Sequence, residues 1–276
     1  MTETKKRFGI SSFALHILAM LFMLCDHMWA TIVPGNHWMT VVGRVAYPIF
    51  AFMIVEGLHH TKNLKKYILR LLAFAVISEI PFNLMYGSAV FYPVHQNVLW
   101  TFLLAIGGIC LIEKVKKKEI AKKDEKVIPP DPSAPTKQKL LALFKKKCLW
   151  RTALVAVPTV AVSALLGQLA MLDFFSGGIL MVYIFYFFYG KKWWCLLGQL
   201  VAMFYVNTQM GGLCFPVTLF GHTFDVVEQG FAMLALLPIW LYNGSQGYHK
   251  KWFQYFCYAF YPAHTLILHA LTYVFT

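Results

Sequence analysis

Residues 16–33 read HILAMLFMLCDHMWATIV, an apolar run that carries Asp26 and His27 side by side near its centre. A run of this length predicts a transmembrane helix, because about 20 residues rising about 1.5 Å each cross the hydrocarbon core. An acid and an imidazole inside such a helix are costly and are rarely left facing lipid. We therefore expect both side chains to turn inward, either as a functional site or as a buried pair that locks helix packing.

The composition extends this interpretation to the whole chain. Of the 276 residues, 59% are hydrophobic and only 13% are charged, which is typical of a protein with several membrane spans. No long soluble stretch is present, so we expect a single membrane domain over residues 1–276. The first apolar segment lacks a small-residue cleavage site and predicts a retained helix. The six scattered cysteines show no CxxC or Cys/His spacing, so neither a disulfide framework nor a metal site is expected.

Hydropathy predicts an all-α fold with nine spans. They cover about 13–33, 40–59, 66–86, 97–113, 151–171, 174–190, 193–207, 227–243 and 253–275. Connecting segments rich in Lys and Arg alternate with segments that contain neither, at 34–39, 87–96, 172–173 and 208–226. By the positive-inside rule, this alternation predicts a cytoplasmic N-terminus and a C-terminus on the outside.

The segment 114–150 is predicted to be a basic cytoplasmic loop. From Lys114 to Arg151, thirteen basic residues against four acidic ones contribute +9 of the formal net charge of +13. Its proline-rich centre, VIPPDPSAP at 127–135, is expected to be extended or disordered. The stretch from Gln138 to Lys147 predicts a short helix on anionic lipid. Topology and lipid explain this charge, so no nucleic-acid partner is expected.

Polar residues from six predicted spans share one range of depth toward the outer side. Glu79 and Asn83 lie four residues apart on one helix face, with Pro81 between them to free a backbone carbonyl. The full set is Asp26, His27, Arg44, Glu79, Asn83, Asn97, Glu228, Gln229, Tyr261 and His264. Random scatter does not favour a common depth, so we predict a shared polar cavity that opens to the outer face.

Several stretches resemble the TraX family of membrane proteins, which is named for the conjugative-pilin acetylase. They are LCDHMW (24–29), GRVAYPIFAFMIVEGLHHTKN (43–63), ISEIPFNLMY (77–86) with QNVLWTFLLA (96–105), and YFCYAFYPAHTLILH (255–269). The second stretch is the most specific, with Gly43-Arg44, Pro48, Glu56-Gly57 and Thr61 in order and at the family's spacing. The family usually has Gly two positions after the His, where this chain has Trp29.

The TraX family is similar in turn to a broader group of transmembrane acyltransferases. That group includes the lysosomal heparan glucosaminide acetyltransferase and bacterial O-antigen acetylases. In it, a cytoplasmic acyl-CoA supplies an acyl group to an acceptor on the far side, and a helix-borne His is essential. The resemblance therefore implies an acetyl-CoA-dependent acyltransferase in a bacterial-type inner membrane. Its acceptor is expected to be an envelope or exported amine or hydroxyl, on a peptide or pilin amino terminus, a sugar or a lipid.

The polar residues fit this chemistry. A neutral imidazole removes the acceptor's proton near neutral pH and needs a second group to fix its tautomer. His27 is the candidate base, or alternatively a nucleophile that forms an acyl-imidazole. We expect Glu79 to orient His27 while Asp26 holds Arg44. Arg44, Asn97 or His264 is expected to donate to the oxyanion, and the candidate substrate-binding residues are Asn83, Asn97, Gln229, Tyr261 and His264.

The coenzyme is expected at the cytoplasmic ends of the spans, where basic side chains pair with its phosphates. The candidate residues are Glu56, His60, Lys62, Lys65, Lys66 and Arg70, with Lys250 and Lys251. The positive-inside rule by itself also predicts lysines at these positions, whether or not a coenzyme binds there. Glu56 and His60 are four residues apart and predict either a pair at the cofactor mouth or an interfacial pair.

Two other classes of protein remain open at this point. A proton-coupled transporter would also carry His, Asp, Glu and Arg within its spans, although the sequence shows no clear two-fold internal repeat. A non-enzymatic assembly or immunity protein would use the polar cluster only to hold helices together. Release of the coenzyme's thiol distinguishes the enzyme from both, and proton flux in liposomes identifies the transporter.

Overall fold

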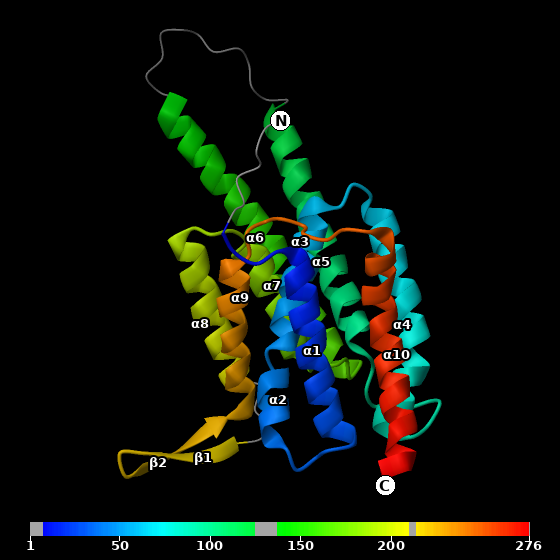
Figure 1. Ribbon diagram of the computed structural model, residues 1–276. Coiled ribbons are helices and arrows are strands. Elements are labelled where there is room, and N and C mark those ends of the chain that lie inside the picture. The colour runs from blue at the N-terminus through cyan, green and yellow to red at the C-terminus, as the bar shows by residue number, and fades with distance from the viewer. Residues whose placement is uncertain (1–7, 125–136, 210–213, 276) are drawn as a thin grey trace, which may run out of the picture.

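The computed structural model describes residues 8–124, 137–209 and 214–275, and helices dominate it (Figure 1). Helical structure occupies all nine segments that hydropathy predicts. In chain order the helices are α1 (Ser12–Thr31), α2 (His37–Gly43), α3 (Ala46–His60), α4 (Leu64–Gly87), α5 (Val98–Asp124), α6 (Lys137–Leu169), α7 (Phe175–Phe187), α8 (Trp193–Gln209), the 3-10 helix η1 (Glu228–Ala235), α9 (Leu236–Leu241) and α10 (Lys251–Phe275). The strands are β1 (Cys214–Leu219) and β2 (His222–Val227).

Among the described residues, five helical stretches are long and apolar enough to cross a membrane. They are Ser12–Thr31, His37–His60, Leu64–Gly87, Val98–Ala121 and Trp150–Leu169. The chain is therefore a helical membrane protein with several spans. The apolar helices Phe175–Phe187 and Glu228–Leu241 are shorter, and polar residues interrupt α10. Nine crossings and a cytoplasmic N-terminus stay predictions.

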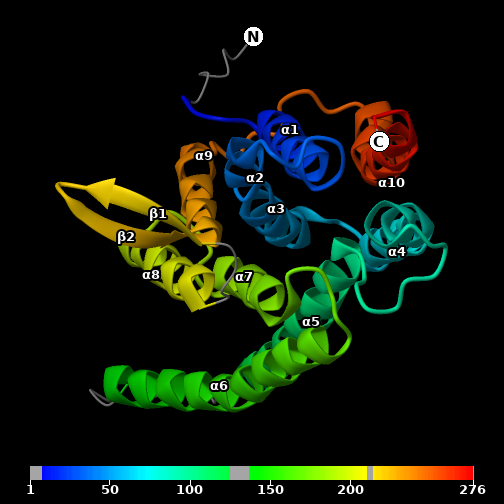
Figure 2. The same ribbon diagram turned by 90° about the horizontal axis from the view of Figure 1, so that it is seen from below.

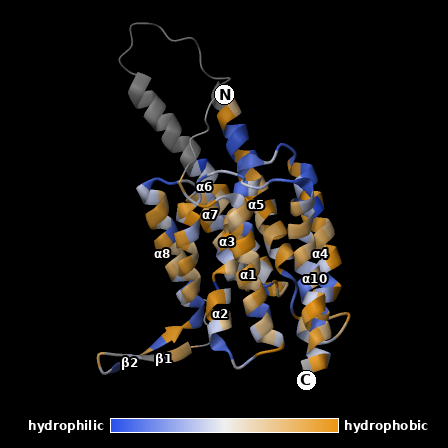
Figure 3. Ribbon diagram, in the orientation of Figure 1, coloured by the Kyte–Doolittle hydropathy of each residue, from blue (hydrophilic) through white to orange (hydrophobic). Residues whose placement is uncertain are grey.

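Apolar side chains cover the outside of the bundle as well as its interior. On α6, Leu154, Val157 and Leu169 are each 69% exposed, and this helix lies at the edge of the bundle (Figure 2). Inside, α7 is largely enclosed, with eight buried residues from Gly177 to Phe185. Apolar residues run along the middle of the helices and hydrophilic ones gather toward the ends (Figure 3). A surface of this kind suits a lipid surrounding.

The two ends of the bundle differ in charge. The start of α1, the α3–α4 link, the end of α5, the α7–α8 link and the start of α10 lie together at one end (Figure 1). Exposed lysines gather there, including Lys62, Lys191, Lys192, Lys250 and Lys251, so we call it the basic end. The α2 helix, the β1–β2 hairpin and the end of α10 lie at the opposite end, which we call the hairpin end.

The segment 114–150 is not a loop along its whole length, which corrects the sequence prediction. α5 continues to Asp124 and α6 begins at Lys137, so both helices project beyond the bundle (Figure 1). Lys, Glu and Ala favour helix, and Arg151 Nη1 donates to Glu119 Oε2 at 3.0 Å across the two projections. The stretch from Gln138 to Lys147 is helical as predicted, but it begins α6 and is not a separate surface helix. The proline-rich centre lies outside the described residues.

The predicted loop 208–226 contains a β-hairpin, so the fold is not helical throughout. β1 and β2 pair antiparallel, with Leu219 opposite His222. The two turn residues, Phe220 and Gly221, have φ of 52° and 81°, which matches the two-residue turns that suit the twist of paired strands. Val and Thr in both strands and Gly in the turn were a readable signal for this hairpin.

The second predicted span is broken where it enters the polar site. α2 ends at Gly43 and α3 begins at Ala46, with Arg44 in the break. A Cβ on Gly43 would lie 2.4 Å from Asp26 Cβ, so only glycine allows α1 and α2 to approach this closely. The close approach brings Asp26 beside Arg44.

Candidate functional site

Arg44 is the centre of a polar cluster between α1, α2 and η1. Its Nη2 donates to Asp26 Oδ1 at 2.9 Å, and its Nε lies 3.3 Å from Glu228 Oε1. Thr40 Oγ1 lies 2.9 Å from Asp26 Oδ1, 2.8 Å from Glu228 Oε1 and 2.7 Å from Arg44 Nη2. The fifth member is Gln229, whose Oε1 accepts from Arg44 Nη1 at 3.4 Å. We call these five residues the arginine cluster.

The arginine cluster confirms part of the sequence prediction. Asp26 does hold Arg44, and Gln229 belongs to the same network. Gln229 Nε2 also donates to Asn207 Oδ1 at 3.1 Å, which connects the cluster to α8. Glu228 lies in the cluster as its predicted depth requires, but its role as a second acidic partner of Arg44 was not predicted. The roles of Thr40 and Asn207 were not predicted either.

His27 turns away from Asp26 and meets His264 of α10. His27 Nδ1 lies 2.7 Å from His264 Nε2, and the two rings lie edge to edge in nearly one plane, with their centroids 4.9 Å apart and their planes 12° apart. His264 Nδ1 in turn lies 2.7 Å from the carbonyl oxygen of Phe260. Both histidines are buried, at 7% and 5% exposure. Successive residues of a helix point about 100° apart, so Asp26 and His27 serve two different partners.

Glu79 does not hydrogen-bond to His27, which corrects the expectation that it orients the imidazole. Its Oε2 accepts from Asn97 Nδ2 and, at 2.8 Å, from Trp100 Nε1. Asn97 Nδ2 also donates to the carbonyl oxygen of Ala75 at 2.9 Å, and its Oδ1 accepts from the Leu99 backbone at 3.1 Å. Asn97 therefore caps α5 and joins it to α4, and its amide hydrogens are not free to stabilise an oxyanion.

Asn83 and Tyr261 are buried close to this region, at 3% and 6% exposure. Asn83 Nδ2 donates to the carbonyl oxygen of Val90 at 3.1 Å. Its Oδ1 and the Tyr261 hydroxyl find no hydrogen-bond partner among the described residues. The Tyr261 ring lies 5.7 Å from the His264 ring, measured between centroids. Tyr261 therefore keeps an unsatisfied hydroxyl near the histidine pair.

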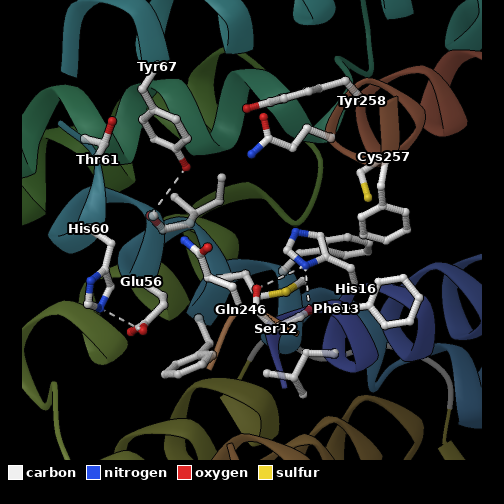
Figure 4. Close-up of a pocket in the computed structure, with 18 of the residues that line it drawn as sticks. Ser12, Phe13, His16, Glu56, His60, Thr61, Tyr67, Gln246, Cys257 and Tyr258 are labelled. Atoms are coloured by element: carbon white, nitrogen blue, oxygen red, sulfur yellow. Dashed lines mark hydrogen bonds and ion pairs between the residues drawn. The ribbon is translucent and has the colours of Figure 1, made fainter. Parts of the chain in front are cut away.

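A cavity of about 740 Å³ runs between α1, α3, α4, α5 and α10 from the basic end (Figure 4). We call it the inner cavity. Its rim includes Lys62, Arg70 and His249, and its walls are largely apolar side chains such as Phe50, Met53 and Leu71. At its far end it reaches Tyr261, one helical turn before His264. The inner cavity therefore leads from the basic end toward the histidine pair.

Four of the six residues predicted for the coenzyme line the inner cavity. They are Glu56, His60, Lys62 and Arg70. Lys65 and Lys66 are exposed on the outside of α4 and do not line it, so their positions are explained by the charge of the basic end. Lys250 and Lys251 are likewise outside the cavity wall.

The Glu56 carboxylate is occupied by three neighbours. It accepts from the Tyr189 hydroxyl at 2.6 Å and the Tyr242 hydroxyl at 3.0 Å, and His60 Nε2 lies 3.0 Å away. The predicted Glu56–His60 pair therefore exists. Glu56 ties α3 to the segments that follow α7 and α9, so it shapes the mouth of the cavity.

Several residues of both regions were not predicted from the sequence. His16 lines the inner cavity with Tyr67, Gln246 and Tyr258 (Figure 4). His95 Nε2 lies 3.2 Å from Asp173 Oδ1. The His95 ring also contacts Tyr86, which contacts His27. No local motif marks these residues, because their partners are distant in the chain.

A helical bundle with buried charged and imidazole groups between its two ends defines a polytopic membrane protein with an intramembrane polar site. Comparison with known proteins gives its family: the chain belongs to the TraX protein family, which matches residues 11–272. This confirms the resemblance identified from the sequence stretches.

One curated relative extends the comparison. The chain is 31% identical over 112 residues to the probable fimbrial assembly protein FimC, serogroup H1, of Dichelobacter nodosus. The match covers 37% of this chain and 46% of that relative, so the chain spans less than half of the relative's length. No solved structure matches the chain.

Proposed function

We propose that this protein is an acyltransferase that moves an acetyl group from acetyl-CoA at the basic end to an amine or hydroxyl at the hairpin end. The observation that carries the proposal is the position of the His27–His264 pair. Tyr261, one turn before His264, lines the inner cavity, and Asp26, beside His27, belongs to the arginine cluster. One imidazole pair thus separates a cavity at one end from a charged cluster toward the other.

The inner cavity suits an acyl-CoA as the donor substrate. Lys62 and Arg70 at its rim supply the cations that pair with phosphates. The apolar walls suit the pantetheine arm, and the depth of the cavity brings a thioester toward Tyr261. In this proposal the basic end faces the cytoplasm of a bacterial-type cell, and the protein lies in the inner membrane.

His27 acts as the general base in the proposed transfer. It accepts the proton of the acceptor's amine or hydroxyl while the acceptor's nitrogen or oxygen bonds to the acyl carbon. The carbon–sulfur bond breaks, and the coenzyme leaves as a thiol after the imidazolium returns the proton to its sulfur. The Tyr261 hydroxyl, which has no partner among the described residues, is suited to donate to the oxyanion.

The arginine cluster is the proposed side of entry for the acceptor. Asp26 and Glu228 together outnumber Arg44 by one charge when both acids are ionised. An excess negative charge in a partly buried site favours a cationic group, so it supports an amine that arrives as an ammonium and releases one proton to water at the hairpin end before its nitrogen attacks the acyl carbon. The relative's name, a probable fimbrial assembly protein, is compatible with an exported polypeptide as the acceptor.

Proton-coupled transport is the second candidate, because a cavity at one end and a charged cluster toward the other also suit a substrate path. A transporter would move protons across sealed liposomes without consuming acetyl-CoA. An assembly protein without enzymatic activity would do neither.

The proposed function is tested with the full chain in nanodiscs, supplied with labelled acetyl-CoA and envelope fractions. We expect thiol release that depends on the fractions, together with label in an acceptor. His27→Ala should abolish transfer while acetyl-CoA binding stays nearly unchanged, because the imidazole acts on the reacting bond. His269→Ala, a histidine change on α10 outside the His27–His264 pair, is the control and should keep full activity. Thiol release that survives His27→Ala would contradict the proposed role.

A further inference from the structure

The protonation of His264 follows from its contact with the backbone. Its Nδ1 lies 2.7 Å from the carbonyl oxygen of Phe260, which can only accept a hydrogen bond. Nδ1 must therefore carry the hydrogen. In the neutral ring the other nitrogen, Nε2, is then an acceptor.

The same reasoning then determines the protonation of His27. His264 Nε2 lies 2.7 Å from His27 Nδ1, and two unprotonated nitrogens at this distance would repel each other. His27 Nδ1 must therefore donate, which leaves the lone pair of the neutral ring on Nε2. No hydrogen bond to His27 Nε2 is found among the described residues, so this nitrogen is unoccupied there.

We propose that His264 is a positioning residue: it holds His27 in the Nδ1–H tautomer and thereby makes Nε2 the atom that takes the acceptor's proton. The tautomer itself stands on the two contacts alone, and its catalytic meaning rests on the proposed function. His264, held by the Phe260 carbonyl, orients His27 in the way that the carboxylate orients the imidazole in a hydrolase triad. It does so without a second buried charge, which would be costly between these helices.

The arrangement also accommodates the proton that catalysis adds. When His27 Nε2 is protonated, Nδ1–H still donates to His264 Nε2, and His264 Nδ1–H still donates to Phe260. Neither contact breaks, so the pair accepts and returns a proton without reorganising. This follows from the geometry of the two contacts. It explains why an imidazole suits the role of orienting His27, which the sequence had led us to expect of Glu79.

The tautomer is measured directly in the full chain labelled with ¹⁵N-histidine, by two-bond ¹H–¹⁵N correlation spectroscopy. The signals of His27 are assigned by their loss in His27→Ala. We expect a protonated Nδ1 and an unprotonated Nε2 for His27 in the wild-type protein at a pH where the ring is neutral. A wild-type His27 that carries its hydrogen on Nε2 would overturn the proposal, whatever the protein's activity.

Two substitutions separate positioning from packing. His264→Leu removes the acceptor, so His27 should shift toward the Nε2–H tautomer that imidazole prefers in water. His264→Glu offers a carboxylate oxygen as many bonds from the backbone as Nε2 is, so it should keep the Nδ1–H tautomer. His269→Leu on the same helix is the control and should leave the His27 signals unchanged.

Kinetics provide the second measurement. In His264→Leu we expect kcat to fall by about 100-fold or more, because general base catalysis and the correct tautomer contribute factors of this size. The KM for acetyl-CoA should change little, and His264→Glu should recover part of kcat. Equal losses in both variants, with an unchanged His27 tautomer, would mean that His264 only packs the helices. If the wild-type protein shows the expected His27 tautomer but no acetyl transfer, the proposed function is refuted and the inference about the tautomer stands. If His264→Leu fails to fold, the wild-type spectrum still tests the tautomer.

Discussion

The shape of the guanidinium group allows Arg44 to hold the arginine cluster together. Three of its nitrogens make separate contacts, with Asp26, Glu228 and Gln229. A planar fork of five donors can satisfy three neighbours at once, whereas an ammonium is a compact point charge on a flexible stem. The Arg44 side chain is only 20% exposed. Little water is therefore available to replace the hydrogen bonds that Arg44 makes with its partners.

Arg44→Lys should therefore impair acetyl transfer even though the charge is kept. We expect a loss of about 10- to 100-fold, since a hydrogen bond to a charged group is worth about 1.5–3 kcal/mol. The rate of transfer to envelope fractions measures it. Arg151→Lys is the control, because Arg151 makes an exposed pair with Glu119 and should tolerate the change. Normal transfer by Arg44→Lys would remove the arginine cluster from the site.

At the scale of elements, the site depends on how closely α1 and α2 pack. Gly43 is the contact point, since a Cβ there would lie 2.4 Å from Asp26 Cβ and 2.6 Å from its Oδ1. The α2–α3 break directly after it presents Arg44 to Asp26. A span that hydropathy predicts as one continuous helix is thus built as two, with the functional arginine between them.

Gly43→Ala should push α1 and α2 apart and destabilise the protein by about 1–3 kcal/mol, the usual cost of overpacking. Thermal unfolding of the purified protein measures the loss. Gly107→Ala on α5 is the matched control, because a Cβ there meets nothing within 4 Å and alanine favours helix over glycine. Similar melting temperatures for Gly43→Ala and the wild type would show that the contact relaxes at no cost.

The whole molecule is asymmetric from end to end. The basic end holds the mouth of the inner cavity, and the hairpin end holds α2 and the β1–β2 hairpin (Figure 1). The proposed function needs these ends on opposite sides of the membrane. The assignment of acetyl-CoA to one end and of the acceptor to the other therefore depends on how the protein is oriented in the membrane.

Single cysteines in a chain whose six native cysteines are replaced by alanine test that orientation. His222→Cys on the hairpin should react with an impermeant thiol reagent in intact cells, and Lys192→Cys at the basic end should react only after lysis. Both positions are exposed, so accessibility within the fold does not separate them. The reverse pattern would place the inner cavity outside the cell and refute cytoplasmic acetyl-CoA as its ligand.

The sequence by itself determined the helical membrane class, the helix segments, the charge difference between their ends and the family. It also predicted the Asp26–Arg44 pair, because a buried acid and a buried base at one depth must meet. These properties depend on composition and on the period of the helix, which can be read locally.

Only the tertiary structure decided which histidine partners His27, which acid completes the arginine cluster, and where the cavity runs. His27 and His264 are 237 residues apart, and depth along the predicted spans favoured Glu79 over His264 as the partner of His27. The choice between them depends on the rotation of each helix about its axis, and packing sets that rotation. The inner cavity is likewise a space between five helices, so no single segment of the sequence encodes it.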